Sequence, residues 1–111
     1  MKKLKVLFMG RKQVAANCLR WLLDSRKDIE VVGVLSDTQL SSSVTGDVAH
    51  DYRIPLFEFE SATLAMRTGD LSFDLGLSML YWRKLKEEFL SVPMFGVVNF
   101  HPAPLPCRLQ T

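Results

Sequence analysis

The strongest constraint on the fold is an alternation of apolar runs and one helical stripe at the start of the chain. Residues 4–9 form an apolar run that is closed by Gly10, and residues 29–35 form a second run rich in valine. Between these runs, apolar residues recur at helical spacing, at Val14, Ala15, Cys18, Leu19, Leu22 and Leu23. A strand, a helix and a strand in this order are typical of a parallel βαβ unit.

The rest of the chain continues this alternation. Short helices are predicted over residues 44–52, 61–67 and 83–90, and strands over residues 54–57, 73–80 and 95–100. Pro55 places its strand at a sheet edge, because proline cannot donate to a ladder. Ser61 is the expected cap of its helix, and Trp21 is expected to cap the core. The pattern predicts an α/β fold with three layers: an open, mainly parallel sheet with helices on both faces.

Charge and cysteine content indicate no unusual partner or compartment. The net charge is +2, and the basic residues form no long block. Cys18 and Cys107 lie far apart and match no metal-ligand spacing, as is typical of free thiols in a reducing compartment. The apolar run at residues 6–9 is too short for a signal peptide or a membrane span. We therefore expect a cytoplasmic protein with no metal, nucleic-acid or membrane partner.

Asn99 and His101 are the most informative polar residues. They lie two apart at the end of a predicted strand and therefore share one side of it. An amide donor and an imidazole that titrates near neutral pH can together hold the negative charge that develops on a carbonyl oxygen. Pro102 and the prolines that follow fix the backbone beyond this pair. The alternative is that both side chains only bond to the backbone of a loop.

A second candidate segment follows the strand predicted at residues 73–80. It consists of Tyr81, Trp82, Arg83, Lys84 and Leu85. Two aromatic side chains beside two bases suit stacking on a flat, anionic ligand. The alternative is that the aromatic side chains pack on the core while the bases face solvent.

Gly10 and Arg11 form a third candidate, because they close the first strand and open the first helix. A helix N-terminus with bases nearby can hold a phosphate or a carboxylate. The single glycine excludes the dinucleotide and P-loop fingerprints, and a plain tight turn is the alternative.

The run from Asn99 to Pro106, Asn-Phe-His-Pro-Ala-Pro-Leu-Pro, resembles the hallmark of enzymes that transfer a formyl group from 10-formyltetrahydrofolate. In that family a strand of a Rossmann-like N-terminal domain ends in Asn-x-His-Pro. The run is most similar to that of the sugar N-formyltransferases, which modify nucleotide-linked amino sugars. Residues 78–85 also resemble that subgroup, at the place of the loop that receives the pterin ring. The resemblance extends over residues 4–106.

The resemblance implies roles for the candidate residues. Asn99 and His101 would stabilise the oxyanion, the backbone of residues 81–85 would bond the pterin edge, and Gly10, Arg11 and Pro102 would contact the acceptor substrate. An aspartate further along the family's domain assists proton transfer. The implied donor is 10-formyltetrahydrofolate, and the implied acceptor is a nucleotide-linked amino sugar, with another amine such as methionyl-tRNA as the alternative.

The chain departs from the family pattern after Pro106. The family continues to Arg-Gly or Lys-Gly, whereas residues 107–111 contain no glycine. The family's catalytic aspartate would lie beyond residue 111. We therefore expect residues 1–111 to be the N-terminal part of a formyltransferase catalytic domain, truncated, with a sheet that is incomplete at its C-terminal end. Such a chain would transfer formyl groups poorly or bind folate without catalysis. The alternative is a structural fragment or a homo-oligomer that pairs through an exposed sheet edge.

Overall fold

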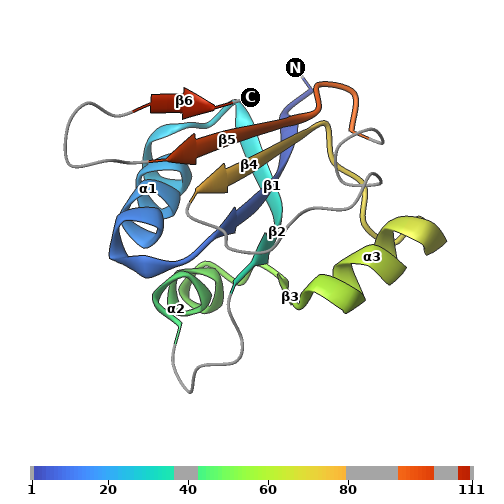
Figure 1. Ribbon diagram of the computed structural model, residues 1–111, viewed down its shortest axis with the longest axis horizontal. Helices are drawn as coiled ribbons and strands as arrows, with labels where there is room; N and C mark the ends of the chain where they lie inside the picture. Colours follow the sequence, from blue (N-terminus) through green and yellow to red (C-terminus); the bar gives the residue numbers. More distant parts are fainter. Residues whose placement is uncertain (1, 37–42, 80–92, 102–107, 111) are drawn as a thin grey trace.

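The computed structural model describes residues 2–36, 43–79, 93–101 and 108–110. In chain order the elements are β1 (Leu4–Gly10), α1 (Lys12–Ser25), β2 (Ile29–Leu35), α2 (Val44–Asp51), β3 (Leu56–Phe57), α3 (Phe59–Thr68), β4 (Leu75–Met79), β5 (Val97–His101) and β6 (Arg108–Gln110) (Figure 1). The predicted strands and helices that fall on these residues are confirmed in kind. The helix predicted over residues 83–90 lies outside the described residues.

The strands form one sheet in the order β3-β2-β1-β4-β5-β6. The first five are all parallel, as predicted, and the register places Gly10 beside Met79 and Met79 beside Phe100. Strand β6 runs antiparallel to β5 and was not predicted. After β3 the chain crosses to the other side of β1, so the carboxyl ends of β1, β4 and β5 are neighbours at one edge. Sheets of this kind bind ligands at that edge.

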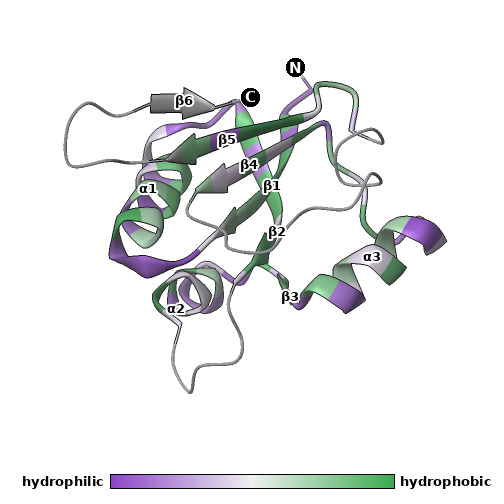
Figure 2. Cartoon of the chain, viewed as in Figure 1, coloured by the Kyte–Doolittle hydropathy of each residue, from purple (hydrophilic) through white to green (hydrophobic). Residues whose placement is uncertain are grey.

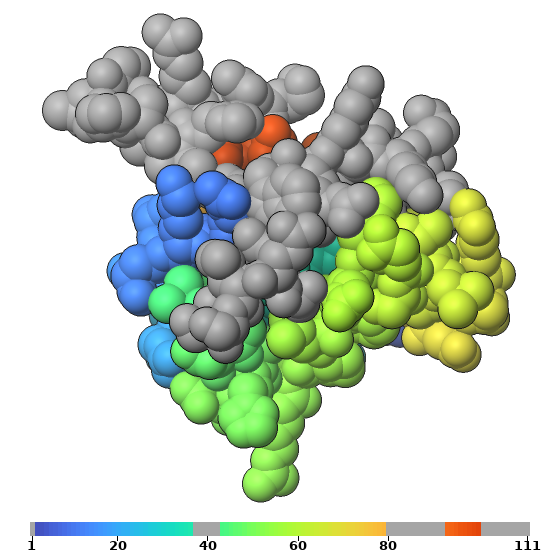
Figure 3. All heavy atoms as spheres, turned by 60° about the horizontal axis from the view of Figure 1, so that its bottom comes forward, coloured from blue at the N-terminus to red at the C-terminus, as the bar shows by residue number. Residues whose placement is uncertain are grey.

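Helices cover both faces of the sheet, which confirms the predicted three layers. One buried cluster joins Phe8 to α1 and α2, and the other joins Leu7 and Met9 to α3. Figure 3 shows α1 and α2, in blue and green, grouped on one side and α3, in yellow-green, on the other. Figure 2 shows apolar residues concentrated on the strands and hydrophilic residues at the turn before α1. The alternation of the strand side chains therefore divides the core in two.

The buried face of α1 differs from the predicted stripe. Its buried residues are Ala15, Ala16, Leu19 and Leu22, whereas Val14 is exposed. Trp21, predicted to cap the core, is 54% exposed. Side chains advance by about 100° per residue around a helix, so Trp21 lies almost opposite Leu19. That prediction was wrong because it used hydrophobicity in place of helical position.

Helix α3 begins earlier than the sequence suggested. Its N-cap is Glu58, and Ser61 stands at the third helical position, where its hydroxyl accepts a hydrogen bond of 3.0 Å from the Glu58 backbone amide. The Glu58 side chain in turn accepts from the Ser61 backbone, which completes a reciprocal capping box. Ser61 therefore contributes to the cap, but not as the N-cap residue.

None of the helices in the described ranges has both the length and the apolar character that a membrane span requires.

Candidate active site

The carboxyl edge of the sheet gathers the described part of the candidate site. Residues at or just beyond the ends of four parallel strands meet there: Gly10 of β1, Ser36 after β2, Met79 of β4 and His101 of β5. The strand register makes the ends of β1, β4 and β5 adjacent. Of the predicted site residues, Tyr81, Trp82, Arg83, Lys84, Leu85 and Pro102 lie outside the described residues.

Asn99 stands near the end of β5, between two other strands. Its register partners are Ser78 of β4 and Gln110 of β6. Val97 packs with the cluster on the α3 face, so Asn99, two residues further on, belongs to the same face. Asn99 is partly buried and Ser78 is buried. The amide is therefore held on a regular strand, which fixes its direction more firmly than a loop would.

His101 is the last residue of β5 and pairs in register with Arg108 of β6. The structure thus places Asn99 and His101 two residues apart on one strand, as the sequence predicted. Strand β6 flanks both positions, a neighbour that the sequence did not reveal because three residues carry no readable alternation.

Gly10 allows three elements to approach closely where β1 ends. A Cβ atom on Gly10 would lie 2.9 Å from the Ala15 Cβ of α1 and 2.9 Å from the Met79 carbonyl oxygen of β4. Real Cβ atoms do not come so close, so any other residue would push α1 or β4 away. Glycine is required here for packing, and a ligand-binding role for Gly10 stays a prediction.

Arg11 is the N-cap of α1, with an extended backbone and no side-chain cap hydrogen bond. Lys12, the first helical residue, has a φ of +71°, in the left-handed region that favours glycine. The first turn of α1 contains no acidic residue. The positive end of this helix dipole therefore meets two basic residues at the carboxyl edge, an arrangement that favours an anion.

A group of hydroxyls anchors the same turn from the neighbouring helix. The Thr45 hydroxyl donates to the Gly10 carbonyl oxygen at 3.0 Å and shares a hydrogen bond of 2.6 Å with the Ser36 hydroxyl. Ser36 also bonds to Ser43, whose hydroxyl caps α2 by accepting from the Gly46 amide at 3.1 Å. Thr45 and Ser36 are both buried. Sequence reasoning missed this group, although a serine followed by a threonine at a helix start is a recognisable capping signal.

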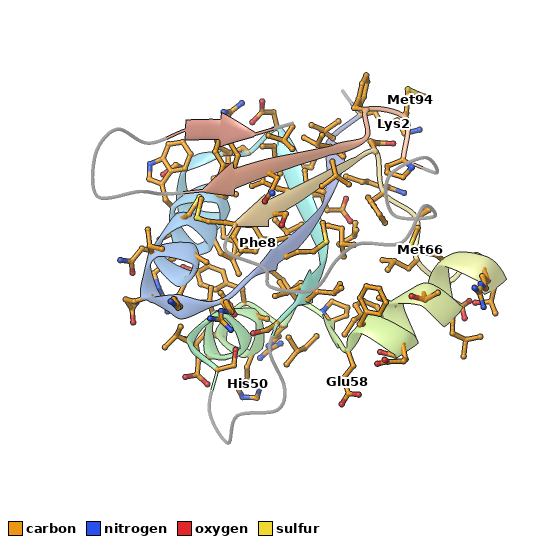
Figure 4. All side chains as sticks on the ribbon, in the orientation of Figure 1. Lys2, Phe8, His50, Glu58, Met66 and Met94 are labelled. Atoms are coloured by element: carbon orange, nitrogen blue, oxygen red, sulfur yellow. The ribbon has the colours of Figure 1, made fainter. Side chains whose placement is uncertain are left out.

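A separate polar cluster joins the exposed surfaces of α1 and α2. The Tyr52 hydroxyl donates a hydrogen bond of 2.5 Å to the Asp24 carboxylate, and this bond raises the pKa of Tyr52 above its usual value. Arg20 lies over the Tyr52 ring and 3.5 Å from Asp51. His50 is exposed, as predicted, and lies on α2 near the lower end of the molecule (Figure 4). These residues hold two helices together and do not belong to the carboxyl edge.

In the described ranges, no group of three or more His, Cys, Asp or Glu side chains is placed so that it could hold a metal ion. Cys18 is partly buried on α1, and burial raises the pKa of its thiol.

Known proteins resemble this chain in sequence and in fold. No family model matches it. The methionyl-tRNA formyltransferase of Kosmotoga olearia is 30% identical over 114 residues, covering 93% of this chain and 36% of the relative. A methionyl-tRNA formyltransferase of Chlamydia trachomatis is also 30% identical, covering 93% of this chain and 35% of the relative. This chain is therefore similar in sequence to about a third of the length of known formyltransferases.

Solved structures of formyltransferases share the fold. A phosphoribosylglycinamide formyltransferase from Anaplasma phagocytophilum superposes with a TM-score of 0.67 at 22% identity, over 95% of this chain and 53% of that one. A 4-N formyltransferase from Francisella tularensis superposes with a TM-score of 0.63 at 13% identity, over 92% of this chain and 39% of that one. The predicted Rossmann-like architecture is thereby confirmed. The chain spans about a third of the length of the curated relatives.

Proposed function

We propose that this chain supplies the part of an enzyme that binds the formyl donor. The enzyme transfers a formyl group from 10-formyltetrahydrofolate to an amine. The observation that carries the proposal is the position of Asn99 and His101. They lie at the end of β5, at the carboxyl edge of the sheet and beside the end of β4. The similarity to formyltransferases supports the reaction class, and the carboxyl edge is where sheets of this kind bind ligands.

Each candidate residue has one task in this proposal. The acceptor amine attacks the formyl carbon, a new carbon–nitrogen bond forms, and negative charge develops on the formyl oxygen. Asn99 donates its amide to that oxygen, and His101 adds a second donor. When the intermediate collapses, the bond to the folate nitrogen breaks, and the proton that the amine loses passes to that nitrogen. Residues 81–85 bond the pterin edge through their backbone, and their aromatic side chains stack on the flat ligand.

The β1–α1 turn is the proposed contact for the acceptor. Gly10 and Arg11 lie at the positive end of the α1 dipole, which favours a phosphate. Pro102, which lies outside the described residues, is proposed as a further contact. A nucleotide-linked amino sugar carries such a phosphate, and this chemistry supports it as the acceptor.

Methionyl-tRNA is the competing acceptor. Two curated relatives that are 30% identical to this chain are methionyl-tRNA formyltransferases, and a tRNA also presents phosphates to a helix N-terminus. The two acceptors share the donor chemistry and differ in the partner, so the assay below offers both.

The first test is titration of a stable 10-formyltetrahydrofolate analogue into the 111-residue chain by calorimetry. Saturable binding is expected, and it should weaken when Trp82→Ala alters the proposed pterin segment. Trp21→Ala is the matched control, because Trp21 is an exposed tryptophan of α1 outside the site. Absence of binding by a chain that circular dichroism shows to be folded would contradict the proposal and favour a structural fragment.

The second test separates binding from chemistry. In an otherwise complete version of the enzyme, Asn99→Ala or His101→Ala should lower formyl transfer by roughly 10²- to 10³-fold and leave the affinity for the folate analogue nearly unchanged. Comparable losses of folate affinity in both variants would refute the assigned roles. Transfer to a nucleotide-linked amino sugar but not to methionyl-tRNA would support the sugar acceptor, and the reverse would support tRNA. Folate binding without any transfer would indicate a non-catalytic module.

A further inference from the structure

A second surface feature lies at the opposite edge of the sheet from the candidate active site. An open pocket there is lined by Lys2, Lys3, Leu4, Asp74, Met94 and Phe95. We call it the amino-edge pocket, because these residues precede or begin β1, β4 and β5. Figure 4 shows Lys2 and Met94 together at the upper corner of the molecule, far from His50 and Glu58.

Two large apolar side chains of the pocket face solvent. Met94 is 79% exposed and Phe95 is 61% exposed. They are neighbours in sequence, and both line the same pocket. A contiguous apolar patch with a polar rim is more typical of a binding surface than scattered apolar residues are.

The turn that carries these side chains is held by backbone hydrogen bonds. Phe95 donates its amide to the Asp74 carbonyl oxygen at 2.8 Å, and Gly96 donates to the Pro93 carbonyl oxygen at 3.1 Å. Gly96 adopts a φ of +72°, which suits glycine, and its carbonyl accepts from the Gly76 amide at 2.9 Å. The patch is therefore presented in a fixed position, which reduces the entropy lost when a partner binds.

The charges around the pocket are mainly basic. Lys2 and Lys3 are exposed, and within the described residues neither forms an ion pair. The one acidic residue of the lining, Asp74, directs its carboxylate to the Lys5 amide at 2.9 Å and so belongs to the fold. Two ammonium groups beside an apolar patch complement a ligand that carries both carboxylates and an apolar side chain.

We propose that the amino-edge pocket docks an acidic segment of a partner protein. In this complex an apolar side chain of the segment packs against Met94 and Phe95 while flanking carboxylates contact Lys2 and Lys3. A second copy of this chain is a poorer occupant, because a two-fold contact would bring the lysines of both copies together. The concave lining and the small number of cations favour a peptide over a lipid surface.

The test uses the 111-residue chain labelled with ¹⁵N and three synthetic peptides. The probes are acetyl-Glu-Glu-Leu-Phe-Glu-Glu-amide, a peptide of equal charge with Gly-Ser in place of Leu-Phe, and a peptide with lysines in place of the glutamates. Only the first should shift the amide signals of Leu4, Phe95 and Gly96 in a saturable way. Equal shifts with the basic peptide, or first-peptide shifts confined to other regions, would overturn the proposal.

Variants separate the two kinds of contact. Lys2→Glu with Lys3→Glu should weaken binding of the first peptide by about tenfold, the loss of two exposed ion pairs, and Lys27→Glu, an exposed lysine outside the pocket, should not. Met94→Ser should weaken binding, whereas Leu64→Ser, an exposed leucine on α3, should not. Unchanged affinity in the pocket variants would refute the proposal.

Binding only to phosphatidylserine vesicles would assign the surface to a membrane. Concentration-dependent dimerisation that these variants abolish would assign it to a second copy. Either result would overturn the peptide partner.

Discussion

The hydroxyl of Thr45, in the first turn of α2, donates a hydrogen bond of 3.0 Å to the backbone carbonyl of Gly10 at the end of β1. This bond ties the turn that opens α1 to a different helix, across the carboxyl edge of the sheet. Ser36, which directly follows β2, shares a hydrogen bond with the same hydroxyl. The position of the β1–α1 turn is therefore set by residues that no ligand needs to touch.

Replacing Thr45 with valine should lower the free energy of unfolding by roughly 1–3 kcal/mol, because the shape is kept while a buried carbonyl and a buried hydroxyl lose their partner. Thr45→Ser keeps the hydroxyl and should cost less. Thr63→Val is the matched control, because that buried hydroxyl donates to the Phe59 carbonyl within its own helix. Urea denaturation measures all three, and equal costs for Thr45→Val and Thr63→Val would contradict the anchoring role.

Gly10→Ala should destabilise the fold by about 1–3 kcal/mol, because the new methyl group collides with Ala15 and with the Met79 carbonyl. Gly46→Ala in α2 provides the comparison. There the nearest atoms, in the Ser43 side chain, lie 3.3 Å away, and alanine favours the helix by about 1 kcal/mol. Its effect should be clearly smaller. Thermal unfolding of both variants tests this order, and a reversed order would show that β1 and α1 can separate easily.

The pKa of Tyr52 should lie above its usual value of about 10, since the hydrogen bond to Asp24 favours the protonated phenol. A folded pKa above the unfolded one means that the bond stabilises the fold below the unfolded pKa, and that this contribution is lost as the pH rises through the folded pKa. In a Tyr81→Phe background, the phenolate absorbance reports Tyr52 alone among the chain's two tyrosines. Asp24→Asn should lower the midpoint, and an unchanged midpoint would mean that the bond is absent in solution.

Trp21 should behave as a solvent-exposed residue in fluorescence. In a Trp82→Phe background, which leaves one of the two tryptophans, its emission should be quenched by acrylamide nearly as readily as that of a short peptide. The cause is its position on the outer side of α1, where 54% of its surface is accessible. Emission that is blue-shifted and protected from quenching would instead place Trp21 against the core or against another molecule.

The sequence predicted the sheet well, because buried parallel strands are apolar throughout and are separated by clear breaks. Residues 4–9 and 29–35 became β1 and β2 with changes of at most one residue. The edge position of β3 followed from Pro55 alone. The placement of Asn99 and His101 at a strand end was also readable from their spacing.

Other features depend on contacts between distant segments and could not be read locally. Trp21 was misplaced because hydrophobicity does not reveal which side of α1 meets the sheet, and the small Ala15 and Ala16 turned out to face it. The hydrogen bond between Ser36 and Thr45 joins residues nine apart in the sequence, and local patterns do not show that folding brings both hydroxyls into the interior. Strand β6 depends on its pairing with β5 and has no pattern of its own.

The central place of β1 also has a consequence for synthesis on the ribosome. Strand β1 is made first, and β2 can pair with one of its edges soon afterwards. Its other edge pairs with β4, which emerges only after α2, β3 and α3 have been made. Throughout that interval the nascent chain presents an apolar strand with open hydrogen-bonding groups, a template for aggregation that chaperones recognise. Slow translation between residues 36 and 75 would lengthen this exposure, so the yield of folded protein should be more sensitive to codon choice there than after β4.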